Sequence, residues 1–216
     1  MLQHNDDGEQ AFQDIVAELQ FYCSGVLPSV AQRIVVRAIR TFARETCIFQ
    51  TSIKPDVQEG VATYELNEFV PEGYDIMGIE EVFWCGECID HISKCRRCRK
   101  PMTCGCAVAK FEMKASDCIE MHPCPGGGLP EDPLAVQVSL CPSYDLCSMP
   151  PELKKYADVI MLLAESYTMK IPKQRWTNFR VGEGKRREAM GELVDIRCHV
   201  NNNFTNEKPR VGECII

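Results

Sequence analysis

The segment from Trp84 to Lys100, WCGECIDHISKCRRCRK, holds four cysteines as two Cys-x-x-Cys pairs with six residues between the pairs. Structural zinc takes four thiolate or imidazole ligands in a tetrahedron, and a Cys-x-x-Cys turn presents two thiolates to one side of the metal. The spacing therefore predicts a structural zinc site whose ligands are Cys85, Cys88, Cys95 and Cys98. A closed four-thiolate site leaves no position for a substrate, so this zinc would stabilise a loop and would not catalyse a reaction.

Other ligand sets stay open on the sequence alone, because further donors lie close by in the chain. The additional candidates are His91, Cys104, Cys106, Cys118 and Cys124. The spacing departs from that of ferredoxin iron–sulfur motifs, and a redox Cys-x-x-Cys is expected within a βαβ unit that the surrounding sequence does not predict. Free or disulfide-bonded cysteines complete the alternatives. Zinc is preferred because crowded, unligated thiolates repel one another and oxidise.

Five basic residues are interleaved with the second cysteine pair. They are Lys94, Arg96, Arg97, Arg99 and Lys100. Cationic neighbours lower the pKa of a thiol and so favour metal binding. The same side chains would contact phosphate, as they do in zinc modules that bind nucleic acids. The alternative function is therefore that of a zinc-dependent nucleic-acid-binding regulatory protein.

The composition limits where and how the chain works. It has 216 residues, 14 cysteines and a formal net charge of −7. It begins with the polar, acidic stretch MLQHNDDGEQ, unlike a signal peptide, and no apolar run reaches the roughly 18 residues of a membrane span. We therefore expect a protein of the reducing cytoplasm with no membrane partner, where paired cysteines are more often metal ligands than disulfides. The negative charge argues against nucleic-acid binding over the whole surface.

No motif in the sequence nominates a catalytic group. The stretch PGGGLP is not followed by Lys-Ser or Lys-Thr, as a phosphate-binding loop would require. A Gly-x-Ser-x-Gly motif is absent, and the four histidines do not form a His-Glu-x-x-His pair. We therefore expect that the chain is not an enzyme.

Hydrophobic periodicity predicts an α+β fold, in which a bundle of three to four helices packs with a central antiparallel β-sandwich or partial barrel. The predicted helices cover residues 9–22, 28–48, 151–170 and 178–199. Short β-rich runs between turn clusters predict β-structure over residues 48–141, with the cysteine-rich insertion 85–106 as an enlarged hairpin loop. We expect a single domain over residues 1–200, followed by an extended C-terminal tail over residues 201–216.

Four arginines share one side of the predicted helix 28–48. Arg33, Arg37, Arg40 and Arg44 are spaced by four, three and four residues, which aligns them as one stripe. No carboxylate follows any of them by three or four residues, so the helix itself compensates almost none of this charge. The stripe is either a solvated basic face or a contact surface for an acidic partner or a neighbouring subunit.

Three patches taken in order carry a family resemblance. The first is LPSVAQRIVVRAIRTFARETCIFQTSI followed by VATYEL and PEGYDIMGIEEVFW, and the second is the strand pair around DCIEMHPCP and PLAVQVSLCPS. The third, MPPELKKYADVIMLLAESYTMKIPKQRWTNFRVGEGKRREAMGELVDIR, contains Pro150, Pro172, Trp176 and Asn178. Together these patches resemble the head-to-tail connector, or adaptor, proteins of tailed bacteriophages, particularly of short-tailed phages. The family has an ordinary loop where this chain has its cysteine cluster.

The resemblance implies a structural virion protein that forms a ring, expected to contain twelve copies, beneath the portal protein of a filled head. Such a ring is a platform for tail, nozzle or fibre proteins, and viral DNA passes through its lumen without sequence-specific contacts. The implied location is the head–tail junction of the virion, after assembly in the cytoplasm of the bacterial host. A net negative charge fits this role, because it keeps a channel from adhering to DNA.

Overall fold

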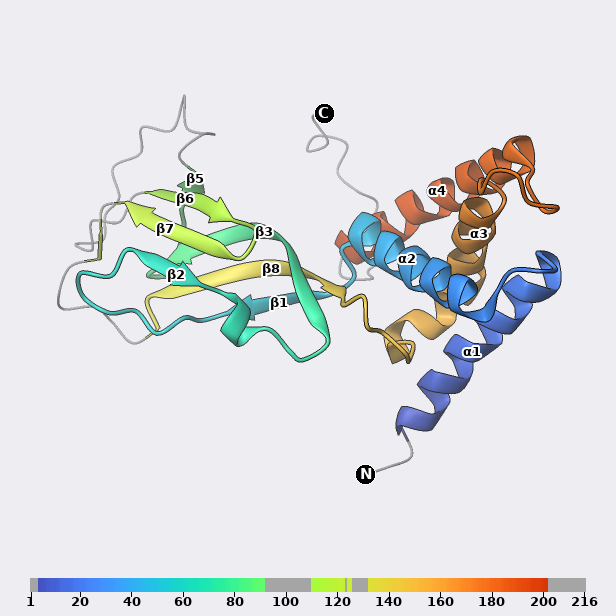
Figure 1. The fold of residues 1–216 in the computed structure, drawn as a ribbon. Coiled ribbons are helices and arrows are strands. Elements are labelled where there is room, and N and C mark those ends of the chain that lie inside the picture. Colours follow the sequence, from blue (N-terminus) through green and yellow to red (C-terminus); the bar gives the residue numbers. More distant parts are fainter. Residues whose placement is uncertain (1–3, 92–109, 123, 126–131, 202–216) are drawn as a thin grey trace. The chain divides into compact units, whose positions relative to one another are not determined.

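The computed structural model describes residues 4–91, 110–122, 124–125 and 132–201. Contacts within the chain divide it into two compact units, a helical unit of residues 1–48 with 142–216 and a β unit of residues 49–141. The predicted α+β class is confirmed, because the described residues form four α-helices and two four-stranded sheets (Figure 1).

The division into a helical unit and a β unit does not test the predicted domain boundaries. A single domain over residues 1–200 stays a prediction, although the chain clusters into two units. The predicted tail, residues 201–216, lies outside the described residues except for Asn201, which ends the last helix.

Among the residues that the structure describes, five helical segments build the helical unit. They are α1 (His4–Tyr22), α2 (Pro28–Thr46), the 3-10 segment η3 (Pro151–Tyr156), α3 (Ala157–Thr168) and α4 (Phe179–Asn201). Helix α2 begins with a proline in its first turn, where the missing N–H has no helical partner to lose. It ends at Thr46 rather than residue 48, because Cys47 adopts a left-handed conformation (φ 51°) that terminates the helix.

The predicted helix over residues 151–170 is two segments rather than one. Its first six residues form η3, and the α-helix begins only at Ala157. The segments meet at Tyr156, whose backbone (φ −113°, ψ 18°) departs from helical values and whose ring centroid lies 5.0 Å from that of Phe42. Packing of this ring on α2 accompanies the break, which hydrophobic spacing alone does not predict.

Two residues quoted for the family resemblance have structural roles in the α3–α4 loop. The Asn178 side-chain oxygen accepts a hydrogen bond from the Val181 N–H at 3.1 Å and so caps the start of α4. The Trp176 ring lies against the α1–α2 turn at Gly25, where an added Cβ would come within 3.2 Å of the ring. Gly25 also has a positive φ of 99°, so the turn favours glycine on both counts.

In the described part of the β unit, eight strands form two sheets, with the orders β1-β8-β3-β4 and β2-β7-β6-β5. The strands are β1 (Gln50–Ile53), β2 (Thr63–Glu65), β3 (Tyr74–Trp84), β4 (Glu87–Cys88), β5 (Asp90–His91), β6 (Lys110–Ala115), β7 (Cys118–His122) and β8 (Leu134–Pro142), with the 3-10 segment η1 (Asn67–Phe69) after β2. Buried side chains from both sheets form one core, which is the packing expected of a sandwich. Trp84 and the alternating residues Leu134, Val136 and Val138 are central to it.

One strand pair corrects the expectation of wholly antiparallel pairing. Strand β5 lies parallel to β6, with Asp90 opposite Lys110 and His91 opposite Phe111. A parallel pair needs a long connection between its strands. Residues 92–109, which contain most of the predicted insertion, provide that connection and lie outside the described residues.

Replacing Gly8 by alanine should destabilise the helical unit, although alanine is the better helix former. A Cβ at Gly8 in α1 would lie 2.5 Å from Ser148 Oγ and 2.8 Å from the Met149 carbonyl oxygen. The Gly8 carbonyl also accepts a hydrogen bond from the Met149 N–H at 3.0 Å, so the backbones cannot separate without losing it. We expect Gly8→Ala to lower the free energy of unfolding by about 1–3 kcal/mol, measured by urea denaturation.

Gly184→Ala is the matched control, because no described atom outside the surrounding turns of α4 lies within 4 Å of the added Cβ. It should raise the free energy of unfolding by up to about 1 kcal/mol. A Gly8→Ala protein at least as stable as the wild type would contradict the close packing of α1 on residues 148–149.

Candidate functional site

The first predicted cysteine pair lies at the hairpin between β3 and β4. Cys85 and Gly86 are the two turn residues, with φ values of 51° and 82°, and Trp84 pairs with Glu87 across the turn. Two consecutive positive φ angles are typical of a type I′ turn, in which glycine is common at the second position. The Cys85 N–H donates a hydrogen bond to the Pro133 carbonyl at 2.7 Å, which holds the turn against β8.

The turn leaves both thiols of this pair within reach of a ligand. The side chain of Cys85 is partly buried, and that of Cys88 is exposed. Cys95 and Cys98 lie outside the described residues, as do Cys104 and Cys106. The four-cysteine ligand set therefore stays a prediction, of which the structure describes the first half.

The acid–base state of Cys88 bears on the redox alternative. Burial raises the pKa of its thiol above the ordinary value, and the carboxylates of Glu81 and Asp90 raise it further. A redox-active or nucleophilic cysteine needs a lowered pKa, since the thiolate is the reactive form. A metal ion would displace the proton, so the raised pKa argues against a redox role and leaves a metal-binding role open.

Two of the additional ligand candidates already interact within the β unit. The His91 Nε2 accepts a hydrogen bond from the Met113 N–H at 3.3 Å, and the imidazole packs edge-on against Phe111 with ring centroids 5.2 Å apart. Burial raises the pKa of the Cys118 thiol, and the carboxylates of Glu65, Asp117 and Glu120 raise it further. Cys124 is exposed.

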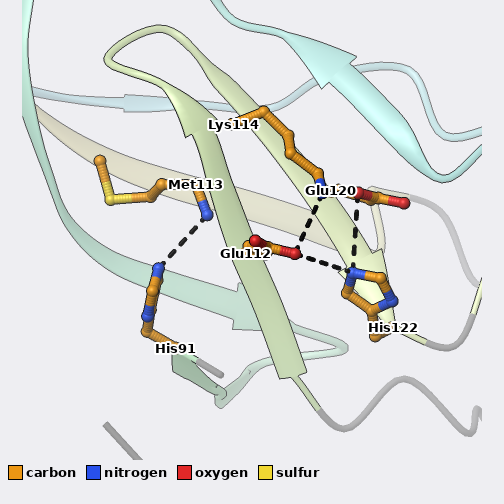
Figure 2. Close-up of polar contacts among 6 residues, drawn as sticks. All are labelled: His91, Glu112, Met113, Lys114, Glu120 and His122. Atoms are coloured by element: carbon orange, nitrogen blue, oxygen red, sulfur yellow. Dashed lines mark hydrogen bonds and ion pairs between the residues drawn. The ribbon is translucent and has the colours of Figure 1, made fainter. Parts of the chain in front are cut away.

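A different group of side chains has the spacing of a metal site. One ligand atom each from Glu112, Glu120 and His122 lies within 4.8 Å of the others, which makes this the one such group among the residues that the structure describes. Glu112 on β6 is directly opposite Glu120 on β7, and His122 follows two residues later on the same face (Figure 2). Carboxylates and an imidazole are ligands that zinc accepts. The described part of the chain therefore contains a possible metal-binding cluster.

The ammonium group of Lys114 already forms ion pairs with both glutamates of this cluster. The Lys114 Nζ lies 2.6 Å from Glu120 Oε2 and 3.1 Å from Glu112 Oε2. Figure 2 shows the Lys114 side chain reaching toward the two glutamates. The His122 Nε2 lies 3.8 Å from an oxygen of each glutamate, and this buried atom has no hydrogen-bond partner among the described residues. A metal ion would have to displace the ammonium group to bind both glutamates. The internal ion pairs thus compete with a metal for the same oxygens.

Sequence reasoning missed this cluster. Its signal is the alternation Glu112-x-Lys114 followed by Glu120-x-His122 across a turn in KFEMKASDCIEMH, which places four titratable groups on one face of a hairpin. The register between the strands is needed to recognise it, because a shift of one residue would move one set of side chains to the opposite face.

The arginine stripe is partly engaged within the helical unit. The Arg37 guanidinium stacks 4.7 Å from the centroid of the Tyr167 ring, and Arg40 stacks 3.7 Å from that of Tyr144. Arg40 also donates a hydrogen bond to the Pro142 carbonyl, and Arg44 Nε pairs with its neighbour Glu45 at 3.2 Å. Arg33 is exposed and makes no salt bridge to any described residue. Three of the four arginines therefore have a described partner, and Glu45, the sequence neighbour of Arg44, is the one described carboxylate among these partners.

No known protein-family model matches this chain, and neither does any curated protein sequence. Among the residues that the structure describes, no helix combines the length and the hydrophobicity needed to cross a membrane.

Removing Lys114 should raise the pKa of Glu120. Hydrogen bonding to Lys114 holds the pKa of this carboxyl below its ordinary value. A lowered pKa means that the ion pair stabilises the fold above the usual pKa of glutamate and that this stabilisation is lost as the pH falls through the lowered pKa. In Lys114→Met, NMR titration of Glu120 should therefore show a pKa closer to that of a free glutamate.

Lys110→Met is the control on the same strand, because Lys110 is not among the groups that shift Glu120. Its Glu120 should titrate as in the wild type. An unchanged Glu120 pKa in Lys114→Met would show that the ammonium group does not hold this carboxylate in solution.

Proposed function

We propose that this chain is a structural subunit of a tailed-phage particle, a head-to-tail connector that forms a ring, expected to have twelve copies, beneath the portal protein. The ring would be the platform for tail, nozzle or fibre proteins, with viral DNA passing through its lumen. The protein would be assembled in the host cytoplasm and act at the head–tail junction of the virion. The proposal assigns it no catalytic activity.

The observation that carries this proposal is an exposed apolar patch at one end of the helical unit. The end patch consists of Phe21, Tyr22 and Leu27, whose exposed fractions are 81%, 58% and 66%. The rings of Phe21 and Tyr22 contact each other edge to face, with centroids 5.7 Å apart. Exposed aromatic clusters of this kind are typical of surfaces that bind other proteins.

The loop between α3 and α4 adds further aromatic side chains to the helical unit. Trp176 lies against Gly25 in the turn between Tyr22 and Leu27, and its buried Nε1 has no hydrogen-bond partner among the described residues. Phe179, three residues further along, is also exposed. Tryptophan, tyrosine and phenylalanine are enriched at the centres of protein interfaces, so this end suits docking to another virion protein.

We further propose that Cys85 and Cys88, with Cys95 and Cys98, hold a structural zinc ion. The tight turn described for the first pair fits such a ligand pair, since it brings two accessible thiols into one short hairpin. Zinc would stabilise an insertion too small to bury a core of its own. The ion's contribution would be structural, so it supports the connector role and adds no reaction.

Purified under reducing conditions, the wild-type protein should contain about one equivalent of zinc, measured by atomic emission. Cys85→Ser/Cys88→Ser should lose it, whereas Glu120→Gln/His122→Asn should keep it. Less than about half an equivalent in the wild type would refute the zinc site. Loss of zinc only from the second variant would assign the ion to the Glu112, Glu120 and His122 cluster instead.

The connector role is tested by electron microscopy of the purified protein, alone and mixed with portal rings. We expect rings, formed either alone or on the portal. Phe21→Ser/Leu27→Ser should weaken portal binding by about tenfold or more, because it removes the apolar centre of the end patch. Val194→Ser is the matched control, since Val194 is similarly exposed (59%) on α4 outside the patch. A wild-type chain that stays monomeric with portal rings present and does not bind them would overturn the proposal.

A further inference from the structure

The helical unit contains a pocket of about 420 Å³ between α1, α3 and α4. Its apolar lining includes Ile15, Met161 and Leu162. Tyr22 of the end patch also lines it. The charged part of the lining is strongly acidic, with Glu18, Asp158, Glu165, Glu188 and Glu192 around a single lysine. A pocket with apolar walls and a ring of carboxylates matches the side chain of arginine, which has an aliphatic stem and a cationic head.

One ion pair inside the pocket is already complete. The Lys185 Nζ lies 2.5 Å from Glu165 Oε2, and Glu165 is only 4% exposed. This pair therefore neutralises itself. The other four carboxylates, those of Glu18, Asp158, Glu188 and Glu192, are exposed and have no salt bridge to any described residue. The pocket thus presents four uncompensated negative charges around an apolar floor.

The matching positive surface is the arginine stripe on α2. At about 100° per residue, its four positions fall within roughly 60° of one another around the helix. Arg33 and Arg37 are exposed at the N-terminal half of this stripe, and neither has a salt bridge to a described residue. No residue of α2 lines the pocket, so the acidic and basic surfaces lie on different parts of one unit. A second copy of the chain can bring them together.

We propose that the α2 stripe of one copy, led by Arg33, docks in the acidic pocket of a second copy. The guanidinium group would pair with carboxylates of the pocket, and its stem would cover the apolar floor. Because two different surfaces meet, the contact is head to tail and repeats from copy to copy, which closes into a ring when the rotation allows it. This inference rests on the proposed ring and identifies the surfaces that build it.

Charge reversal tests the contact directly. Arg33→Glu and Glu192→Arg should each weaken self-association by about tenfold or more, because each places like charges across the interface. Association is measured by analytical ultracentrifugation, or by ring formation on the portal if the wild type assembles only there. Arg187→Glu is the matched control, since it makes the same charge change on the face of α4 away from Lys185, Glu188 and Glu192. It should associate like the wild type.

Mixing the two variants separates a contact between copies from a folding defect. In an equimolar mixture, the glutamate introduced by Arg33→Glu in one variant meets the arginine introduced by Glu192→Arg in the other. At the next contact, the native Arg33 of the Glu192→Arg variant meets the native Glu192 of the Arg33→Glu variant. Alternating assemblies should therefore form with near wild-type affinity, and no misfolded variant would be rescued in this way. The Arg33→Glu/Glu192→Arg double variant should also associate alone.

The outcomes distinguish this inference from the proposed function. If the wild type forms rings or binds the portal and neither reversal weakens assembly, the stripe–pocket contact is wrong and the connector role stands. If both reversals weaken assembly but the mixture and the double variant do not recover, the two surfaces do not face each other and the contact is likewise wrong. If the wild type forms no ring, alone or on the portal, the connector role itself fails and this inference fails with it.

Discussion

Helix α2 packs against α1, α3 and α4, so most of its circumference is buried. Val35, Ile39 and Phe42 are removed from solvent on this buried side. The four arginines of α2 therefore lie on the side that remains exposed, because burying a guanidinium group without compensation is costly. The packing of one helix thus sets the rotation of α2, completes the core of the helical unit and concentrates positive charge along a single line.

An analogous constraint organises the β unit. Its two sheets share one core, so residues on each strand alternate between that core and the opposite face. Ile119 and Met121 face inward on β7, which leaves Glu120 and His122 outward beside Lys114. Strand β3 ends in the fully buried Trp84, and the cysteine turn begins at the next residue. The first cysteine pair and the Glu112, Glu120 and His122 cluster are therefore carried by backbone that the core holds in place.

Patterns that repeat along one element were predictable from the sequence, whereas features that depend on contacts between distant residues were not. The arginine stripe and the helices follow from spacing along one element. The sequence predicted one enlarged hairpin loop over residues 85–106, whereas a tight turn at Cys85 and Gly86 leads directly into β4. The break at Tyr156 is accompanied by packing of its ring on Phe42, more than a hundred positions earlier, which no local pattern reports. Likewise, the parallel pairing of Asp90 with Lys110 and the meeting of Glu112 with Glu120 require the strand register. Helix α1 extends back to His4 past Gly8, because a tertiary contact with Met149 offsets a weak helix former.

The pairing of β1 with β8 has a consequence for folding. Gln50 lies opposite Ser139, and the Leu140 N–H donates to the Phe49 carbonyl at 2.8 Å, so the chain enters and leaves the β unit side by side. The two halves of the helical unit, residues 1–48 and 142–216, are far apart in sequence. Once β1 and β8 have paired, the connection between α2 and η3 behaves as a short loop, and its closure costs little entropy. A β unit that forms early would therefore hold the two halves of the helical unit close together in the chain. The sequence between β1 and β8 could then vary widely with little effect on the stability of the helical unit.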